Sequence, residues 1–175
     1  MALFEDFLQG LLDVSLTKEV IEFADGGALG IDWLYADDCK EDAPIVLFLP
    51  GITGSSTDCS YILYPAQEVY ARKWRAIVYN PRGLGGVQLR NKIAYNSARH
   101  DDVAEVIERV HTRYPKAKII GCGFSMGGLN GAVELSRNTY RRISCAFRRH
   151  DCFSSFRPAI DNNFLGGVHA YLKIE

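Results

Sequence analysis

The sequence has no long apolar run and almost no net charge. Its longest uninterrupted apolar run, from Ile45 to Leu49, is far shorter than the ~20 residues that a membrane-spanning helix needs. The N-terminus, Met-Ala-Leu-Phe-Glu-Asp-Phe-Leu, carries acids where a secretory signal carries basic residues. A formal net charge of −1 gives no overall attraction to nucleic acid. We therefore expect a protein of the cytoplasm, or of a cytosol-facing membrane surface, that binds no nucleic acid.

Cysteine and histidine are also scarce. The five cysteines are odd in number and form no C-x-x-C pair, and two of them, Cys122 and Cys145, lie in apolar strand-like runs. This usage predicts reduced thiols in a core rather than a disulfide framework. The four histidines stand at no spacing from cysteines or carboxylates that fits a metal-ligand set. The sequence therefore predicts neither a metal nor a cofactor.

The hydrophobic pattern predicts a hairpin followed by alternating strands and helices. Two strand-like runs, 17–23 and 28–35, are joined by Asp25-Gly26-Gly27, whose glycines permit the positive φ of a tight turn. Continuous apolar strands are predicted at 45–49, 76–79, 118–124 and 143–147, with helices at 61–73, 102–114 and 126–137. Asp102 and Glu105 have the spacing of a capping box. The pattern indicates an α/β three-layer sandwich, a mostly parallel sheet with an N-terminal antiparallel hairpin.

One short motif carries chemistry. Gly123-Phe-Ser-Met-Gly127 matches G-x-S-x-G and lies between a predicted strand and a predicted helix, the context of a nucleophile elbow. A serine on such a turn holds a strained backbone, and glycines two residues to either side keep Cβ atoms away from the neighbouring strand and helix. The bare motif also arises by chance, so its position after a strand gives it weight. We predict Ser125 as a nucleophile.

A second element would complete the site. An oxyanion hole in this type of fold takes one N–H from the residue after the nucleophile and one from the loop after an earlier strand. Met126 supplies the first, and the segment Leu49-Pro-Gly-Ile-Thr-Gly54 predicts Ile52 as the second. The alternative interpretation of Pro50-Gly51 is an ordinary turn after a strand. Beside the elbow, the oxyanion interpretation is favoured.

Several of these segments together resemble the AB hydrolase 4 family, the group of abhydrolase-domain proteins 1 and 3. The matching stretches are Phe23-Ala-Asp-Gly-Gly27, Ile31-Asp-Trp33, Leu49-Pro-Gly-Ile-Thr-Gly54, Tyr79-Asn-Pro-Arg-Gly83, Gly123-Phe-Ser-Met-Gly-Gly128 and Asp151-Cys-Phe153. The resemblance implies an α/β-hydrolase fold and a serine carboxylic-ester hydrolase of esterase or lipase type. Its substrates would be acylglycerols, phospholipids or short-chain esters, cleaved through an acyl-enzyme on Ser125.

The base and the acid of a catalytic triad are harder to find. In this fold they follow the serine in the order Asp or Glu, then His. His169 is the one histidine near a family-like Gly-Gly-His stretch and is predicted as the base, although the same stretch also resembles the start of a cap helix. Asp151 and Asp161 follow Ser125, and Asp151 matches a family position that is not the acid. The alternative function is therefore an inactive, truncated hydrolase fold that acts as a binding or regulatory remnant.

The family resemblance and the hydrophobic pattern divide the chain into three segments. Residues 1–16 have apolar side chains at helical spacing and predict an amphipathic helix. Residues 17–157 are predicted to form a partial α/β-hydrolase domain whose last strands are missing, and 158–175 a tail or the start of a cap region. Six arginines between 137 and 157 could meet phospholipid headgroups in a peripheral membrane contact. The alternative is a solvated face that flanks a strand.

Overall fold

The strands form one sheet in a computed structural model that describes residues 16–56, 58–96, 100–136, 143–144 and 169–174. Within these residues the sheet has seven strands in the order β1-β2-β4-β3-β5-β7-β6. The strands are β1 (Leu16–Glu22), β2 (Ala28–Leu34), β3 (Ile45–Leu49), β4 (Arg75–Asn80), β5 (Ile119–Phe124), β6 (Ile143–Ser144) and β7 (His169–Ile174). The helices are α2 (Ser60–Ala71), α3 (Asp101–Arg113) and α4 (Met126–Ser136).

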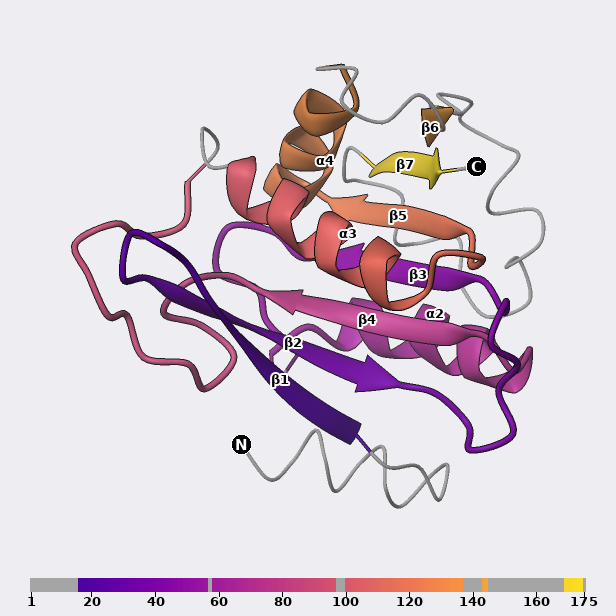
Figure 1. The fold of residues 1–175 in the computed structure, drawn as a ribbon. Helices are drawn as coiled ribbons and strands as arrows, with labels where there is room; N and C mark the ends of the chain where they lie inside the picture. The colour runs from indigo at the N-terminus through magenta and orange to yellow at the C-terminus, as the bar shows by residue number, and fades with distance from the viewer. Residues whose placement is uncertain (1–15, 57, 97–99, 137–142, 145–168, 175) are drawn as a thin grey trace.

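The sheet is parallel at its centre and antiparallel on both sides. β3 pairs in parallel with β4 and with β5, so the carboxyl ends of these three strands meet at one edge (Figure 1). β2 runs antiparallel to both β1 and β4, which brings the hairpin turn to the same edge. β7 runs antiparallel to β5 and to β6. The loops that follow the central strands therefore converge at this carboxyl edge.

Helices cover both faces of the sheet, as alternate residues of β3 show. Ile45, Leu47 and Leu49 belong to one buried cluster with the apolar face of α3, whereas Val46 and Phe48 belong to another with α2. Successive side chains of a strand point to opposite faces, so a strand buried on both faces is apolar throughout. Figure 1 shows α3 and α4 on one side of the sheet and α2 on the other. The three-layer sandwich predicted from the sequence is confirmed.

The predicted hairpin, central strands and helices are confirmed to within about two residues at their ends. The predicted cap of α3 is wrong. The helix begins at Asp101, and Asp102 is a buried residue of its first turn. Its carboxylate accepts hydrogen bonds from the side chain of Arg82, a contact that no local pattern can indicate. His111, near the end of α3, is exposed.

The C-terminal prediction also needs correction. Residues 169–174 form β7, a strand that pairs with β5, and not the start of a cap helix. An unpaired β5 would leave a row of backbone donors and acceptors at a sheet edge, and β7 satisfies them. The strand predicted at 143–147 is present as β6 over 143–144. Of the helix predicted at 1–16, residues 1–15 lie outside the described residues, and Leu16 is the first residue of β1. The arginines between 137 and 157, and Asp151 and Asp161, also lie outside the described residues.

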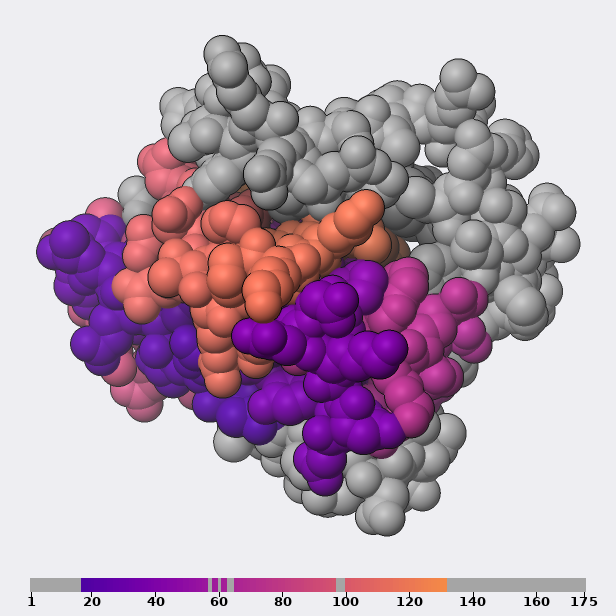
Figure 2. All heavy atoms as spheres, turned by 45° about the vertical axis from the view of Figure 1, so that its right-hand side comes forward, coloured from indigo at the N-terminus to yellow at the C-terminus, as the bar shows by residue number. Residues whose placement is uncertain are grey.

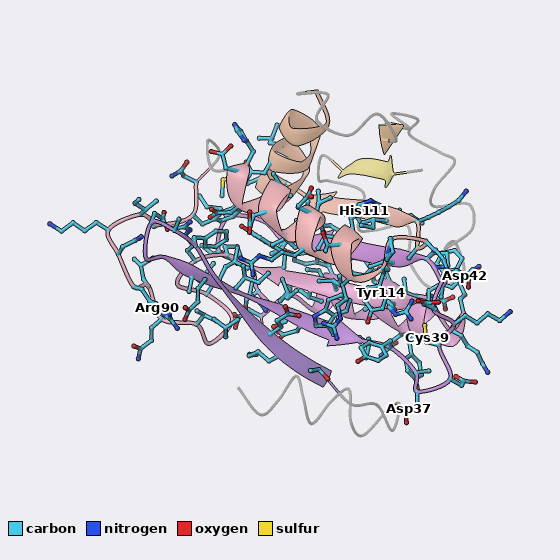
Figure 3. The ribbon with its side chains drawn as sticks, in the orientation of Figure 1. Asp37, Cys39, Asp42, Arg90, His111 and Tyr114 are labelled. Atoms are coloured by element: carbon cyan, nitrogen blue, oxygen red, sulfur yellow. The ribbon has the colours of Figure 1, made fainter. Side chains whose placement is uncertain are left out.

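The opposite edge of the sheet, where the parallel strands begin, is held by Arg75. Its guanidinium is buried, donates to the carbonyl of Ala43 at 3.3 Å and lies 4.2 Å from the ring centre of Tyr114. Figure 2 brings this edge forward, with the loop after β2 beside the end of α2, and Figure 3 labels Asp37, Cys39 and Asp42 on that loop. The elbow at Ser125 thus lies at the edge of the sheet opposite to Arg75 and Tyr114.

A buried ion cluster ties the hairpin turn to α3. The side chain of Arg82, in the loop after β4, donates to both carboxylate oxygens of Asp102 at 2.7 and 2.8 Å and to Asp25 at 2.7 Å. Its guanidinium also stacks 4.4 Å from the ring centre of Phe23. A Cβ on Gly27 would lie 1.9 Å from an Arg82 nitrogen, so only glycine leaves room for the guanidinium there. The cluster therefore joins three segments of the carboxyl edge.

We expect Asp102→Ala to lower the free energy of unfolding by about 3 kcal/mol, because a buried guanidinium then loses its bidentate partner. The matched control is Glu105→Ala in the same helix, whose ion pair with Arg109 is about half exposed and worth about 0.5 kcal/mol or less. Urea unfolding followed by circular dichroism measures both variants. Equal losses for the two variants would contradict a structural role for the cluster.

Candidate active site

Ser125 lies between β5 and α4 in a backbone conformation that is unfavourable for any residue but glycine. Its φ is 52°, in the left-handed region that typically costs about 1–3 kcal/mol for a residue with a Cβ. Its carbonyl accepts hydrogen bonds from the N–H groups of Gly128 at 3.0 Å and Leu129 at 3.2 Å, which starts α4. The residue itself is exposed at the carboxyl edge of the sheet. This is the geometry of a strand–turn–helix elbow.

The glycines of the motif are required by close packing. A Cβ on Gly123 would lie 2.6 Å from the Cα of Gly128, and a Cβ on Gly127 would lie 2.2 Å from the carbonyl oxygen of Leu49. Both distances are far below van der Waals contact. The tight turn therefore depends on glycine at these two positions, and β3 and β5 hold it from two sides.

The loop after β3 lies against the elbow. A Cβ built on Gly51 would be 3.6 Å from the Cβ of Ser125, so the two residues are neighbours. The N–H of Gly54 donates to the carbonyl of Gly51 at 3.0 Å, which closes a turn around Ile52. The Ile52 side chain is 63% exposed, and that of Met126 is buried. The first N–H groups of a helix have no acceptor within the helix, and the N–H of Met126, the first residue of α4, is the one that the oxyanion prediction uses.

Tyr61 is a site residue that the sequence analysis missed. Its hydroxyl accepts hydrogen bonds from the N–H of Gly51 at 3.4 Å and from the thiol of Cys59 at 3.0 Å. Its ring packs against that of Phe124, with 4.7 Å between centroids. Burial, with the Cys59 hydrogen bond as a second cause, raises the pKa of Tyr61 to about 12. Through its hydrogen bond with Gly51, the Tyr61 side chain supports the loop that lies beside Ser125.

The structure brings the backbone of His169 close to the elbow. His169 is the first residue of β7 and pairs with Phe124, the residue that precedes Ser125. The other described histidines belong to α3 and its start: His100 lies beside Asp101, with 3.0 Å between Nδ1 and the carboxylate, and His111 is exposed near the end of the helix (Figure 3). His169 therefore stays the predicted base, while Asp151 and Asp161 lie outside the described residues.

Two further properties of the described residues bear on the site. Among them, no group of three or more histidine, cysteine, aspartate or glutamate side chains could hold a metal ion. None of the helices in this part of the chain is both long and apolar enough to cross a membrane.

We expect Gly127→Ala to lower the free energy of unfolding by about 3 kcal/mol, because its Cβ would collide with the backbone of β3. Gly51→Ala is the matched control, since its Cβ meets only ordinary contacts at 3.6 Å and beyond, and a change within about 0.5 kcal/mol is expected. Thermal and urea unfolding test both variants. A Gly127→Ala protein as stable as Gly51→Ala would refute the close approach.

We expect the Tyr61 phenol to ionise near pH 12 in the folded protein and near its ordinary value of about 10 in denaturant. A pKa raised by folding means that the stabilisation is complete below about pH 10 and is lost as the pH rises through 12. The measurement is absorbance at 295 nm after a rapid pH jump, taken as the difference between the parent and Tyr61→Phe. A difference step near pH 10 in the folded protein would contradict the burial of this hydroxyl.

Comparisons with known proteins agree with the fold. Over 113 residues the chain is 53% identical to Protein abhd-3.2 of Caenorhabditis elegans, covering 65% of this chain and 30% of that protein. It is 37% identical over 132 residues to Phospholipase ABHD3 of Homo sapiens, covering 73% of this chain and 32% of that one. The chain thus spans about a third of the length of these relatives.

A solved structure and a family profile point to the same fold. The Pyrococcus furiosus esterase Pf2001 superimposes with a TM-score of 0.60 at 22% identity, over 74% of this chain and 49% of that chain. The profile of the alpha/beta hydrolase fold matches residues 44–146, which include β3, β4, β5 and the elbow. Since this match spans more than half of the sequence, the chain belongs to the alpha/beta hydrolase fold family.

Proposed function

We propose that this chain carries the nucleophile and the oxyanion hole of a lipase- or esterase-type hydrolase that cleaves carboxylic esters through an acyl-enzyme on Ser125. The observation that carries the proposal is the left-handed backbone of Ser125, with φ at 52°. A strained, exposed serine costs stability, and such strain typically persists where it serves chemistry. The packing of Gly123 and Gly127 holds this conformation in place.

In the first step, the hydroxyl of Ser125 attacks the ester carbonyl while a base takes its proton. The carbonyl oxygen becomes an oxyanion, which the N–H groups of Met126 and Ile52 would stabilise. One such donor is worth about 10²- to 10³-fold in turnover. The intermediate then expels the alcohol, which receives the proton from the base, and the acyl group stays on Ser125. Water attacks the acyl-enzyme in the second step, releases the acid and restores the serine.

The base in this proposal is His169. An imidazole at the sheet edge would need to reach the Ser125 hydroxyl at about 2.6–3.2 Å, directly or through one water. The backbone pairing of His169 with Phe124 supports a base from this strand. A carboxylate that orients the imidazole completes the usual triad. Asp161 follows Ser125 in the required order, whereas Asp151 matches a family position that is not the acid.

Acyl lipids are the substrates that the surroundings of Ser125 favour. The side chains of Ile52 and Leu129 are 63% and 56% exposed; one follows β3 and the other lies in the first turn of α4. Large apolar side chains exposed beside a nucleophile suit the hydrocarbon part of an acylglycerol or phospholipid ester. The name of the human relative, Phospholipase ABHD3, points to the same class of substrate.

We expect a fluorophosphonate probe to label the folded chain on Ser125, because the probe reacts only with an activated hydroxyl. Ser125→Ala should lower labelling by at least about 10³-fold. The matched control is Thr112→Ala, which removes an exposed hydroxyl from α3 and should label like the parent. Gel fluorescence and mass spectrometry of the labelled peptide measure the result. A folded parent that takes up no probe would favour the alternative, an inactive fold that serves as a binding remnant.

A further inference from the structure

Three buried polar side chains connect the loop after β3 to two neighbouring strands. Asp32 of β2, Asn80 at the end of β4 and Ser56 in the loop are between 0% and 4% exposed. The hydroxyl of Ser56 donates to Oδ2 of Asp32, and Nδ2 of Asn80 donates to the same oxygen at 2.7 Å. The N–H of Ser56 donates to Oδ1 of Asn80 at 2.7 Å. Each of the three residues is therefore hydrogen-bonded to the other two.

This network fixes the orientation of each member. The amide of Asn80 donates to a carboxylate and accepts from a backbone N–H, so a flipped amide would break both bonds. The other carboxylate oxygen of Asp32 lies 3.7 Å from the ammonium of Lys18, which also donates to the carbonyl of Gly85 at 2.9 Å. A Cβ on Gly85 would lie 2.3 Å from Cγ of Asn80. The asparagine amide is therefore held by packing as well as by hydrogen bonds.

The carboxylate of Asp32 is a costly group to bury, so its contribution to the geometry of the loop is of interest beside its contribution to stability. Moving a charge out of water costs free energy, and the attraction of its buried partners often does no more than offset this cost. An apolar cluster of the same size is therefore often as stable. A hydrogen-bonded network has, in return, one geometry in which all its members are satisfied. Asp32 therefore sets where Ser56 lies, and with it where the loop leaves the sheet.

The same loop reaches the nucleophile. Ser56 is five residues after Gly51, which lies beside Ser125, and the turn from Gly51 to Gly54 encloses Ile52. We propose that Asp32, Asn80 and Ser56 are positioning residues that hold the Ile52 N–H toward the oxyanion formed on Ser125. This inference rests on the proposed function, because it assigns the network to one donor of that site. None of the three side chains needs to touch the substrate.

The test uses Ser56→Ala and the nearly isosteric Asp32→Asn in the whole chain, with Val110→Ala as control. Val110 is a buried residue of α3 in the cluster on one face of the sheet, so its truncation lowers stability without touching the network. Hydrogen exchange by mass spectrometry reports on residues 51–56 and, separately, on 101–113. In both network variants we expect the amides of residues 51–56 to exchange about tenfold faster. The amides of residues 101–113 should exchange at the parental rate, because local openings are largely independent.

The second readout is turnover of a p-nitrophenyl ester, corrected for active sites by fluorophosphonate titration. An oxyanion donor acts in the transition state, so we expect kcat to fall about tenfold in the network variants, less than the loss of a whole donor, with KM within twofold. Val110→Ala should keep the parental kcat per titrated site. Unchanged exchange in 51–56, or faster exchange with an unchanged kcat, would overturn the inference. A parent chain that takes up no probe would instead overturn the proposed function, while the exchange data still decide whether the network anchors the loop.

Discussion

The left-handed backbone of Ser125 is the constraint on which the rest of the site depends. It turns the chain from β5 into α4 within one residue and leaves the serine exposed at the carboxyl edge. The conformation costs free energy, and close packing offsets that cost: Gly127 lies against the backbone of β3, and Gly123 lies against Gly128. The elbow is therefore rigid because two central strands of the parallel sheet enclose it, and not because the turn is favourable in itself.

Two buried polar clusters stabilise the same edge, and they account for segments that the family resemblance picks out. Arg82 joins the hairpin turn to α3 through Asp25 and Asp102, whereas Asp32 joins β2 to the loop after β3 through Ser56. Both clusters hold charges that would be costly without their partners. The matching residues of the hairpin and of the loop after β4 thus hold their loops together at the carboxyl edge of the sheet.

The sequence predicts those parts of the molecule whose causes are local. The apolar run at 45–49 predicts a strand buried on both faces, and the strand before Ser125 turns a common motif into an elbow. It cannot predict the partner of Asp102, because a first-turn acid looks like a cap until Arg82, 20 residues away, occupies it. Tyr61 gave no signal for the same reason: its contacts with Gly51 and Phe124 arise only when α2 packs on the sheet.

The antiparallel β7 bears on how a base could reach the nucleophile. In an antiparallel pair, opposed Cα atoms lie about 4.5–5.5 Å apart, so the backbone of His169 lies about that far from the backbone of Phe124, with Ser125 next along the chain. The proposed base thus comes from the strand on the side of β5 away from β3. The proposed oxyanion donor Ile52 belongs to the loop after β3, on the other side of β5, so under the proposed function the carbonyl of a bound ester would lie between base and donor.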